Sequence, residues 1–144
     1  MSDIKNHILL QLKLTKNIME NEHNKYLKPY GISNEQGLLL KLVYEMPGLS
    51  QTQIAEELHK DKTTITRMIN TLIKKDKLMR KSSLEDKRVF EIYVTEKTKE
   101  NVKKLTPVFE KQKKDLEDII GESDYNTTIK VLEKIKKYYL ELNQ

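Results

Sequence analysis

The stretch from Leu49 to Thr95 constrains the fold of this chain most, because it places two short amphipathic helices directly before an alternating strand. Ser50 and Gln53 have the spacing of a capping box, which opens the first helix. After a turn at residues 59–61, the second helix carries apolar residues at the spacing of one helical face, namely Ile65, Met68, Ile69, Leu72 and Ile73. Small Ala55 suits the close helix crossing of a helix-turn-helix unit.

A β-hairpin is predicted after the second helix. Leu78 to Lys81 is a basic strand, residues 82–87 form a polar turn, and the run from Arg88 to Val94 alternates. We expect the alternating residues of that run on one buried face, namely Phe90, Ile92 and Val94. Helix, turn, helix and hairpin make a winged helix-turn-helix, a mainly α fold with a small β wing, whose default use is DNA binding.

The outer face of the second helix favours this use. It carries donors and small hydroxyls, with no carboxylate after Asp61: Lys62, Thr63, Thr64, Thr66, Arg67, Asn70, Lys74 and Lys75. A helix-turn-helix pattern alone is weak evidence, since any two packed helices can produce it, and the net charge of +5 fits a merely lysine-rich surface as well. The hairpin, this face and the basic segment 74–81 together indicate DNA binding.

Composition excludes several other classes. The chain has no cysteine, so disulfides and thiol chemistry are excluded. Its histidines, His7, His23 and His59, form no cluster with metal-ligand spacing, so we expect no metal and no cofactor. No run approaches ~18 apolar residues and no signal-peptide pattern opens the chain, so we expect a cytoplasmic protein without a membrane partner.

Helices are predicted on both sides of the hairpin and the two helices before it. Residues 3–28 read as one helix that is apolar on more than one side, and Ser33 with Gln36 caps a helix over 33–46. Residues 96–120 read as a long helix with a kink or restart at Thr106-Pro107. A last helix then follows Gly121, capped by Ser123 or Asp124.

The flanking helices carry more apolar side chains than one face can bury, which predicts a homodimer. A small winged unit cannot cover them, so we expect residues 1–32 and 96–144 to form dimerisation helices around a DNA-binding lobe at 33–95. A two-fold dimer would hold two recognition helices about 34 Å apart, one turn of DNA.

The chain resembles the multiple antibiotic resistance regulator (MarR) family along essentially its whole length. The residues that carry the resemblance are Leu49-Ser50-Gln51, Ile54-Ala55, Leu58, Lys62-Thr63-Thr64-Ile65-Thr66-Arg67, Leu72, Arg80, Glu85-Asp86-Lys87-Arg88 and Val94-Thr95-Glu96-Lys97. The resemblance implies a homodimeric transcription regulator, usually a repressor, that binds a palindromic operator and is often released by a small aromatic or anionic ligand. Asp76 and Thr98 stand where that family commonly has glycine, and neither belongs to the DNA-facing set.

Roles follow for the DNA-facing residues. The predicted base or groove contacts are Thr63, Thr64, Thr66, Arg67 and Asn70, with Arg67 reading guanine and Asn70 adenine. The predicted phosphate contacts are Ser50, Gln51, Lys62, Lys74 and Lys75. At the wing, Asp86 is expected to hold Arg88 for the minor groove, although both could be merely solvated turn residues.

An effector site is predicted where the first helix meets the lobe. Tyr26 and Tyr30 suit a flat, largely apolar ligand, and Asn17, Lys28 or Arg67 could orient an anionic or phenolic group. The alternative is that these tyrosines simply pack the hinge.

Two other classes of function were weighed. An enzyme is disfavoured, because the chain has no Gly-rich loop, no cysteine and no supported Ser-His-Asp order. The second is a DNA-bridging architectural protein with little sequence choice and no effector, which differs from a regulator in its ratio of specific to non-specific affinity.

Overall fold

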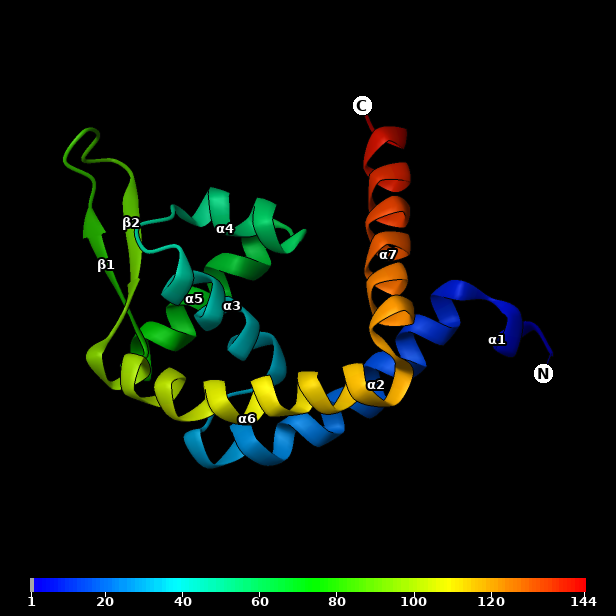
Figure 1. Cartoon of the computed structure of the whole chain (residues 1–144). Coiled ribbons are helices and arrows are strands. Elements are labelled where there is room, and N and C mark those ends of the chain that lie inside the picture. The colour runs from blue at the N-terminus through cyan, green and yellow to red at the C-terminus, as the bar shows by residue number, and fades with distance from the viewer. Residues whose placement is uncertain (1) are drawn as a thin grey trace. The chain divides into compact units, whose positions relative to one another are not determined.

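The computed structural model describes residues 2–144 and builds them from helices and one hairpin (Figure 1). In chain order the elements are α1 Ser2–Asn6, α2 Ile8–Leu27, the 3₁₀ turn η1 Lys28–Tyr30, α3 Asn34–Glu45, α4 Gln51–Leu58, α5 Lys62–Lys74, β1 Leu78–Ser82, β2 Phe90–Val94, α6 Glu96–Ile120 and α7 Glu122–Leu142. The chain divides within α6 into two compact units, one ending at Lys103 and one beginning at Lys104. The predicted mainly α fold with a β-hairpin wing is confirmed.

Both capping boxes are present. The Ser50 hydroxyl accepts a hydrogen bond from the backbone N–H of Gln53 at 3.1 Å, and the Gln53 side chain accepts one from the Ser50 N–H at 2.9 Å. Ser33 and Gln36 make the same pair of bonds before α3, at 3.1 Å each. These local bonds satisfy N–H groups that a helix start otherwise leaves unpaired, which is why the spacing alone located both helices.

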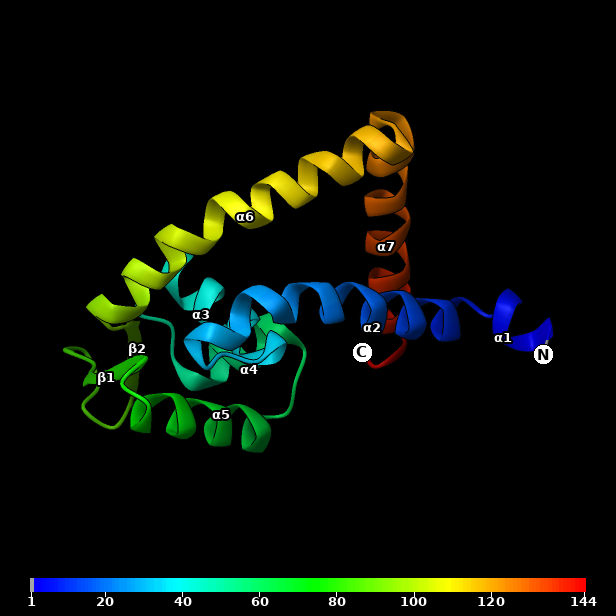
Figure 2. The ribbon, with the colours of Figure 1, turned by 90° about the horizontal axis from the view of Figure 1, so that it is seen from below.

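The core of the first unit lies among α3, α4, α5 and β2 (Figure 2). All four elements contribute fully buried side chains, which include Leu39, Val43, Ile54, Ile65, Ile69, Leu72 and Ile92. Helix α2 joins this unit through α3, where the Asn34 side-chain amide donates to the Glu20 carbonyl at 3.1 Å.

The hairpin is antiparallel, with Leu78 opposite Val94 and Ser82 opposite Phe90. Leu49 forms an isolated β-bridge with β2, since the Ile92 N–H donates to the Leu49 carbonyl at 2.9 Å. Ile92 and Val94 are buried as predicted, but Phe90 is 41% exposed, so the predicted burial of Phe90 is wrong. Phe90 pairs with the last residue of β1, next to the wing tip, and the Arg80 guanidinium lies over its ring.

Three predicted helix features are wrong. Residues 3–28 do not form one helix, because His7 is extended between α1 and α2 and the Gln11 side chain satisfies the Lys5 carbonyl at 3.0 Å. Helix α6 continues through Pro107, so the predicted restart is wrong, while the kink that was its alternative stays a prediction.

Helix α7 begins at Glu122 after Gly121, without a side-chain cap. The predicted cap residue Asp124 lies inside its first turn instead, where acidic side chains favour the positive end of the helix dipole.

Large apolar side chains are exposed on the terminal helices. In α2, Ile8 is 61% and Ile18 71% exposed. In the second unit the exposed set is Leu116, Ile119, Ile120, Ile129, Val131, Tyr138, Tyr139, Leu140 and Leu142. Among residues 2–144, none of the helices combines the length and apolar character needed to cross a membrane.

Candidate nucleic-acid interface

Helix α5 is opened by Asp61, a residue to which the sequence assigned no role. Its carboxylate accepts from the Thr64 N–H at 2.8 Å and from the Thr64 hydroxyl at 2.7 Å. These two bonds hold the pKa of Asp61 below its ordinary value, so the cap is ionised at neutral pH. Thr64 was predicted to contact a groove, but its single hydroxyl proton is engaged here and only its lone pairs and methyl group remain for DNA.

The exposed face of α5 gathers three of the predicted base contacts. Thr63, Arg67 and Asn70 are all exposed and follow the i, i+4, i+7 spacing of one helical stripe. Thr66 is half-buried, and its hydroxyl donates to the Gln51 side chain of α4 at 3.1 Å. Thr66 and Gln51 therefore tie the two helices together, in addition to any contact that they make with DNA.

The predicted phosphate contacts lie at helix ends. Lys62 begins α5, Lys74 ends it, and both are exposed. Lys75 follows as the C-cap, and its ammonium donates to the Gly31 carbonyl at 3.5 Å. Ser50 caps α4 through its lone pairs, so its hydroxyl proton is still available for a phosphate.

The wing contains the predicted ion pair. Asp86 accepts from the Arg88 Nε at 3.2 Å, from its Nη2 at 3.3 Å and from its backbone N–H at 3.0 Å. This contact lowers the pKa of Asp86, and the Arg88 side chain is 90% exposed. The Arg88 guanidinium is therefore oriented and open to solvent, while its contact with a minor groove stays a prediction.

Arg80 is a candidate that the sequence reasoning missed. The guanidinium of this β1 residue donates to the Asn70 side-chain oxygen of α5 at 2.5 Å and lies 5.5 Å from the centre of the Phe90 ring. The alternation of β1 was the available signal, since Arg80 shares a hairpin face with buried Leu78 and with Ile92, its cross-strand partner.

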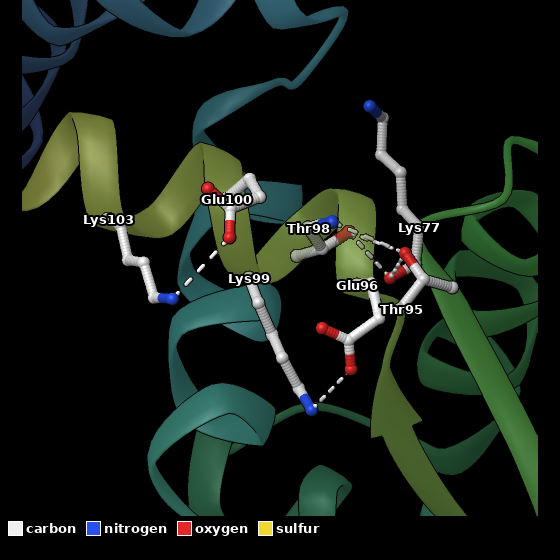
Figure 3. Close-up of polar contacts among 7 residues, drawn as sticks. All are labelled: Lys77, Thr95, Glu96, Thr98, Lys99, Glu100 and Lys103. Carbon is white, nitrogen blue, oxygen red and sulfur yellow. Dashed lines mark hydrogen bonds and ion pairs between the residues drawn. The ribbon is translucent and has the colours of Figure 1, made fainter.

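A polar junction joins the wing to α6 (Figure 3). Thr95 caps the helix by accepting from the Thr98 N–H at 3.3 Å, and its hydroxyl donates to the Asp76 carbonyl at 2.8 Å. The buried Thr98 hydroxyl donates to the Lys77 carbonyl at 2.7 Å. Threonine at 98 thus gains a bond that a glycine there could not make.

Lys77 itself is buried, and its ammonium donates to the Tyr30 carbonyl of η1 at 2.8 Å. Burial lowers the pKa of this lysine. The same residue therefore connects the base of the wing to the turn after α2.

The predicted effector residues lie on three separate elements. Asn17, Tyr26 and Lys28 are exposed on α2 and η1, Tyr30 is half-buried in η1, and Arg67 lies on the outer face of α5. A hollow of about 340 Å³ in the first unit includes none of these five and is lined instead by Tyr44, Pro47, Met79, Lys81, Tyr93, Val94, Glu96 and Lys99. The effector site stays a prediction.

Comparison with known proteins gives matches over the lobe and over most of the chain. Residues 32–90 match the model of the MarR family. A curated relative, described as an uncharacterized HTH-type transcriptional regulator, YybA of Bacillus subtilis strain 168, is 28% identical over 94 residues. That match spans 65% of this chain and 63% of the relative, so less than two thirds of the relative's length is covered.

Solved structures share the architecture. A complex of S. aureus MepR with DNA has a TM-score of 0.79 at 22% identity, covering 88% of this chain and 94% of that one. The transcriptional repressor CouR bound to a 23-mer DNA duplex has a TM-score of 0.81 at 20% identity, covering 94% and 96%. A MarR protein from Peptoclostridium difficile has a TM-score of 0.82 at 23% identity, covering 92% and 86%. At these identities the likeness establishes the winged-helix fold.

Proposed function

We propose that this chain, whose residues 32–90 match the model of the MarR family, is a transcriptional regulator of that family that binds a palindromic DNA operator as a homodimer in the cytoplasm. It acts as a repressor by occupying that operator, and it is not an enzyme. Two of the similar structures are described as DNA complexes, and one of those proteins is described as a transcriptional repressor.

The observation that carries the proposal is the pairing of two DNA-reading elements in one unit. Helix α5 presents Thr63, Arg67 and Asn70 as an exposed stripe of donors and acceptors. The wing presents Arg88, oriented by Asp86. A recognition helix of this kind enters the major groove, and an arginine beside it suits a narrow, electronegative minor groove.

The homodimer is supported by the exposed apolar side chains of the terminal helices. Side chains such as Ile18 and Ile119 are 71% and 81% exposed in the single chain, which a partner surface would cover. Two copies related by a two-fold axis would read the two halves of a palindrome.

Release by a small aromatic or anionic molecule is the regulatory part of the proposal. Such a ligand would bind near Tyr26 and Tyr30 and favour a dimer whose recognition helices no longer match the DNA turn. Release of ~10–100-fold needs a differential affinity of about 1.4–2.8 kcal/mol between the two forms.

Selection of bound fragments from a random DNA library, followed by titration of the selected site and of unrelated DNA, tests the function. We expect the selected site to bind at least ~10³-fold more tightly than unrelated DNA. A ratio near one would contradict the regulator and favour the architectural alternative.

Arg88→Ala is the matching variant. It should weaken binding and reduce the slope of log affinity against log salt by about 1, because one cation no longer displaces a counterion. Lys114→Ala, which removes one exposed charge from α6 outside the winged lobe, is the control for net charge. If both variants behave alike, the wing is not a DNA contact.

A further inference from the structure

Strand β1 lies beside α5 and pairs with β2 (Figure 2). Arg80 of β1 contacts one residue of each of these two neighbours. Its Nη2 donates to the Oδ1 atom of Asn70 at 2.5 Å. Its guanidinium carbon lies 5.5 Å from the centre of the Phe90 ring on β2. Asn70, Arg80 and Phe90 are all at least partly exposed, on the side of α5 that carries the predicted DNA contacts.

The two contacts require the shape of an arginine. A planar guanidinium can lie over a ring and donate within its own plane at the same time, whereas a lysine ammonium is a point charge on a flexible stem. Phe90, whose exposure the alternation of β2 did not predict, therefore supplies a surface on which Arg80 is held toward α5.

The bond to Arg80 changes what Asn70 offers to a base. An asparagine reads adenine with its oxygen accepting from N6 and its nitrogen donating to N7. Here one of the two lone pairs of the Asn70 oxygen already accepts a charged hydrogen bond, and the guanidinium beside it disfavours a second donor such as the adenine N6, so the side chain offers mainly its amide hydrogens. Guanine is the base that presents two adjacent acceptors, O6 and N7, in the major groove.

We propose that Arg80 is a specificity-determining residue that positions Asn70, and that the pair reads guanine rather than adenine at the base pair that Asn70 reaches. This rests on the proposed function, and it replaces the adenine preference expected from the sequence for Asn70. Arg80 acts through Asn70, so its removal should change which base is preferred as well as how tightly DNA binds.

The chain offers a closely matched control in the next residue. Lys81 follows Arg80 on β1, points to the other face of the hairpin, and has its ammonium 4.9 Å from the centre of the Tyr93 ring. Lys81→Ala thus removes the same charge from the same strand and the same kind of cation–ring contact, while the Asn70–Arg80 bond stays in place.

The test is selection from a random DNA library with the full-length wild type and with Arg80→Ala, Arg80→Lys, Asn70→Ala and Lys81→Ala. We expect one guanine preference of the wild type to disappear in Asn70→Ala, with discrimination falling at least about fivefold. Arg80→Ala and Arg80→Lys should both lose that preference and gain adenine at the same position, although Arg80→Lys keeps the charge. Lys81→Ala should keep the guanine.

Two results would overturn the inference. One is a wild-type preference for adenine at the position that Asn70→Ala identifies. The other is an Arg80→Lys protein, folded by circular dichroism, whose base preferences equal those of the wild type, because Arg80 would then contribute charge alone. Failure of the proposed function itself looks different, since the wild type would then select no sequence at all.

Discussion

The winged lobe and the terminal helices use the same apolar residue types in opposite ways. In the lobe, Ile65 and Ile69 of α5 are fully buried. On the terminal helices, Ile18 of α2 is 71% exposed and Ile119 of α6 is 81% exposed. Burying an isoleucine side chain contributes about 1.5–3 kcal/mol, so the lobe has gained this stabilisation within one chain and the terminal helices have not.

This difference indicates which part of the molecule depends on association. The lobe encloses a core of fully buried apolar side chains, and Lys77 at the base of its wing and Thr98 at the start of α6 are buried polar residues that both donate to backbone carbonyls. In the second unit, most of the large apolar side chains of α7 remain open to solvent.

The largest effect is expected from removing residues 124–144, which make up nearly all of α7. If these residues cover apolar surface in the proposed homodimer, the shortened chain should aggregate or lose helicity, because the α6 side chains that they cover would be left in water. Sedimentation and circular dichroism measure both outcomes. A stable, soluble monomer with unchanged helicity in the remaining chain would contradict the dimer.

A matched pair of substitutions compares the two regions directly. Ile69→Ala removes a fully buried side chain and should lower the free energy of unfolding by about 2–5 kcal/mol, through lost burial and a cavity. Ile119→Ala should lower it far less in dilute protein and should instead raise the dimer dissociation constant several-fold. Denaturant unfolding at several protein concentrations separates the two effects.

For Ile119→Ala the shift in unfolding should depend on protein concentration, because association is coupled to stability. For Ile69→Ala the shift should stay nearly constant. An Ile119→Ala protein that dimerises as the wild type does would place this part of α6 outside the interface.

Local patterns in the sequence predicted the elements well. The capping boxes at Ser33 and Ser50 and the helix over 96–120 rest on residues a few positions apart, and the structure confirms them. The break at His7 was not predictable in this way, because it depends on the Gln11 side chain bonding to the carbonyl of a residue in the preceding helix.

Contacts between elements explain what the sequence missed at the candidate interface. The Arg80–Asn70 bond joins a strand to a helix, and the Lys77 contact with Tyr30 spans 47 positions. The alternation of β1 indicates only which hairpin face carries Arg80, and no periodicity in the sequence identifies the partner residue in either contact. The Asp61 cap is the exception, since Asp61 and Thr64 have the ordinary spacing of a helix start, which the sequence alone displays.

A smaller effect is expected at the junction between the wing and α6. Thr98→Val keeps the shape of the side chain but removes its bond to the Lys77 carbonyl, and it should cost about 1 kcal/mol of unfolding free energy. The cost is limited because the Thr95 N–H also donates to that carbonyl, at 3.2 Å.

Thr128→Val is the matched control for Thr98→Val. Thr128 is exposed on α7, where its hydroxyl donates to the Asp124 carbonyl at 2.7 Å, and water can replace that bond. Equal costs at the two positions, measured by urea unfolding, would mean that burial of Thr98 adds nothing to its hydrogen bond.

The smallest effect is expected from Lys77→Met, and it should be visible in the pH dependence of stability. Burial lowers the pKa of Lys77 in the folded protein below its ordinary value of 10.5. Between the lowered pKa and 10.5 the unfolded chain therefore binds more protons at this residue, so the contribution of Lys77 to folding rises as pH rises through that window. Below the window both states are protonated, and the cost of burying the charge is partly offset by its bond to the Tyr30 carbonyl and by the nearby Asp76 carboxylate.

Methionine at 77 keeps the apolar stem and cannot titrate, so the variant should lack this alkaline rise and should be about as stable as the wild type at neutral pH. The measurement is urea unfolding of both proteins from pH 7 to 10.5, with Lys114→Met, which replaces an exposed lysine of α6, as the control for the loss of one positive charge. If the unfolding free energies of the wild type and of Lys77→Met follow parallel curves over the whole pH range, the Lys77 ammonium is solvated. The base of the wing would then be exposed to water, as the apolar side chains of the terminal helices are.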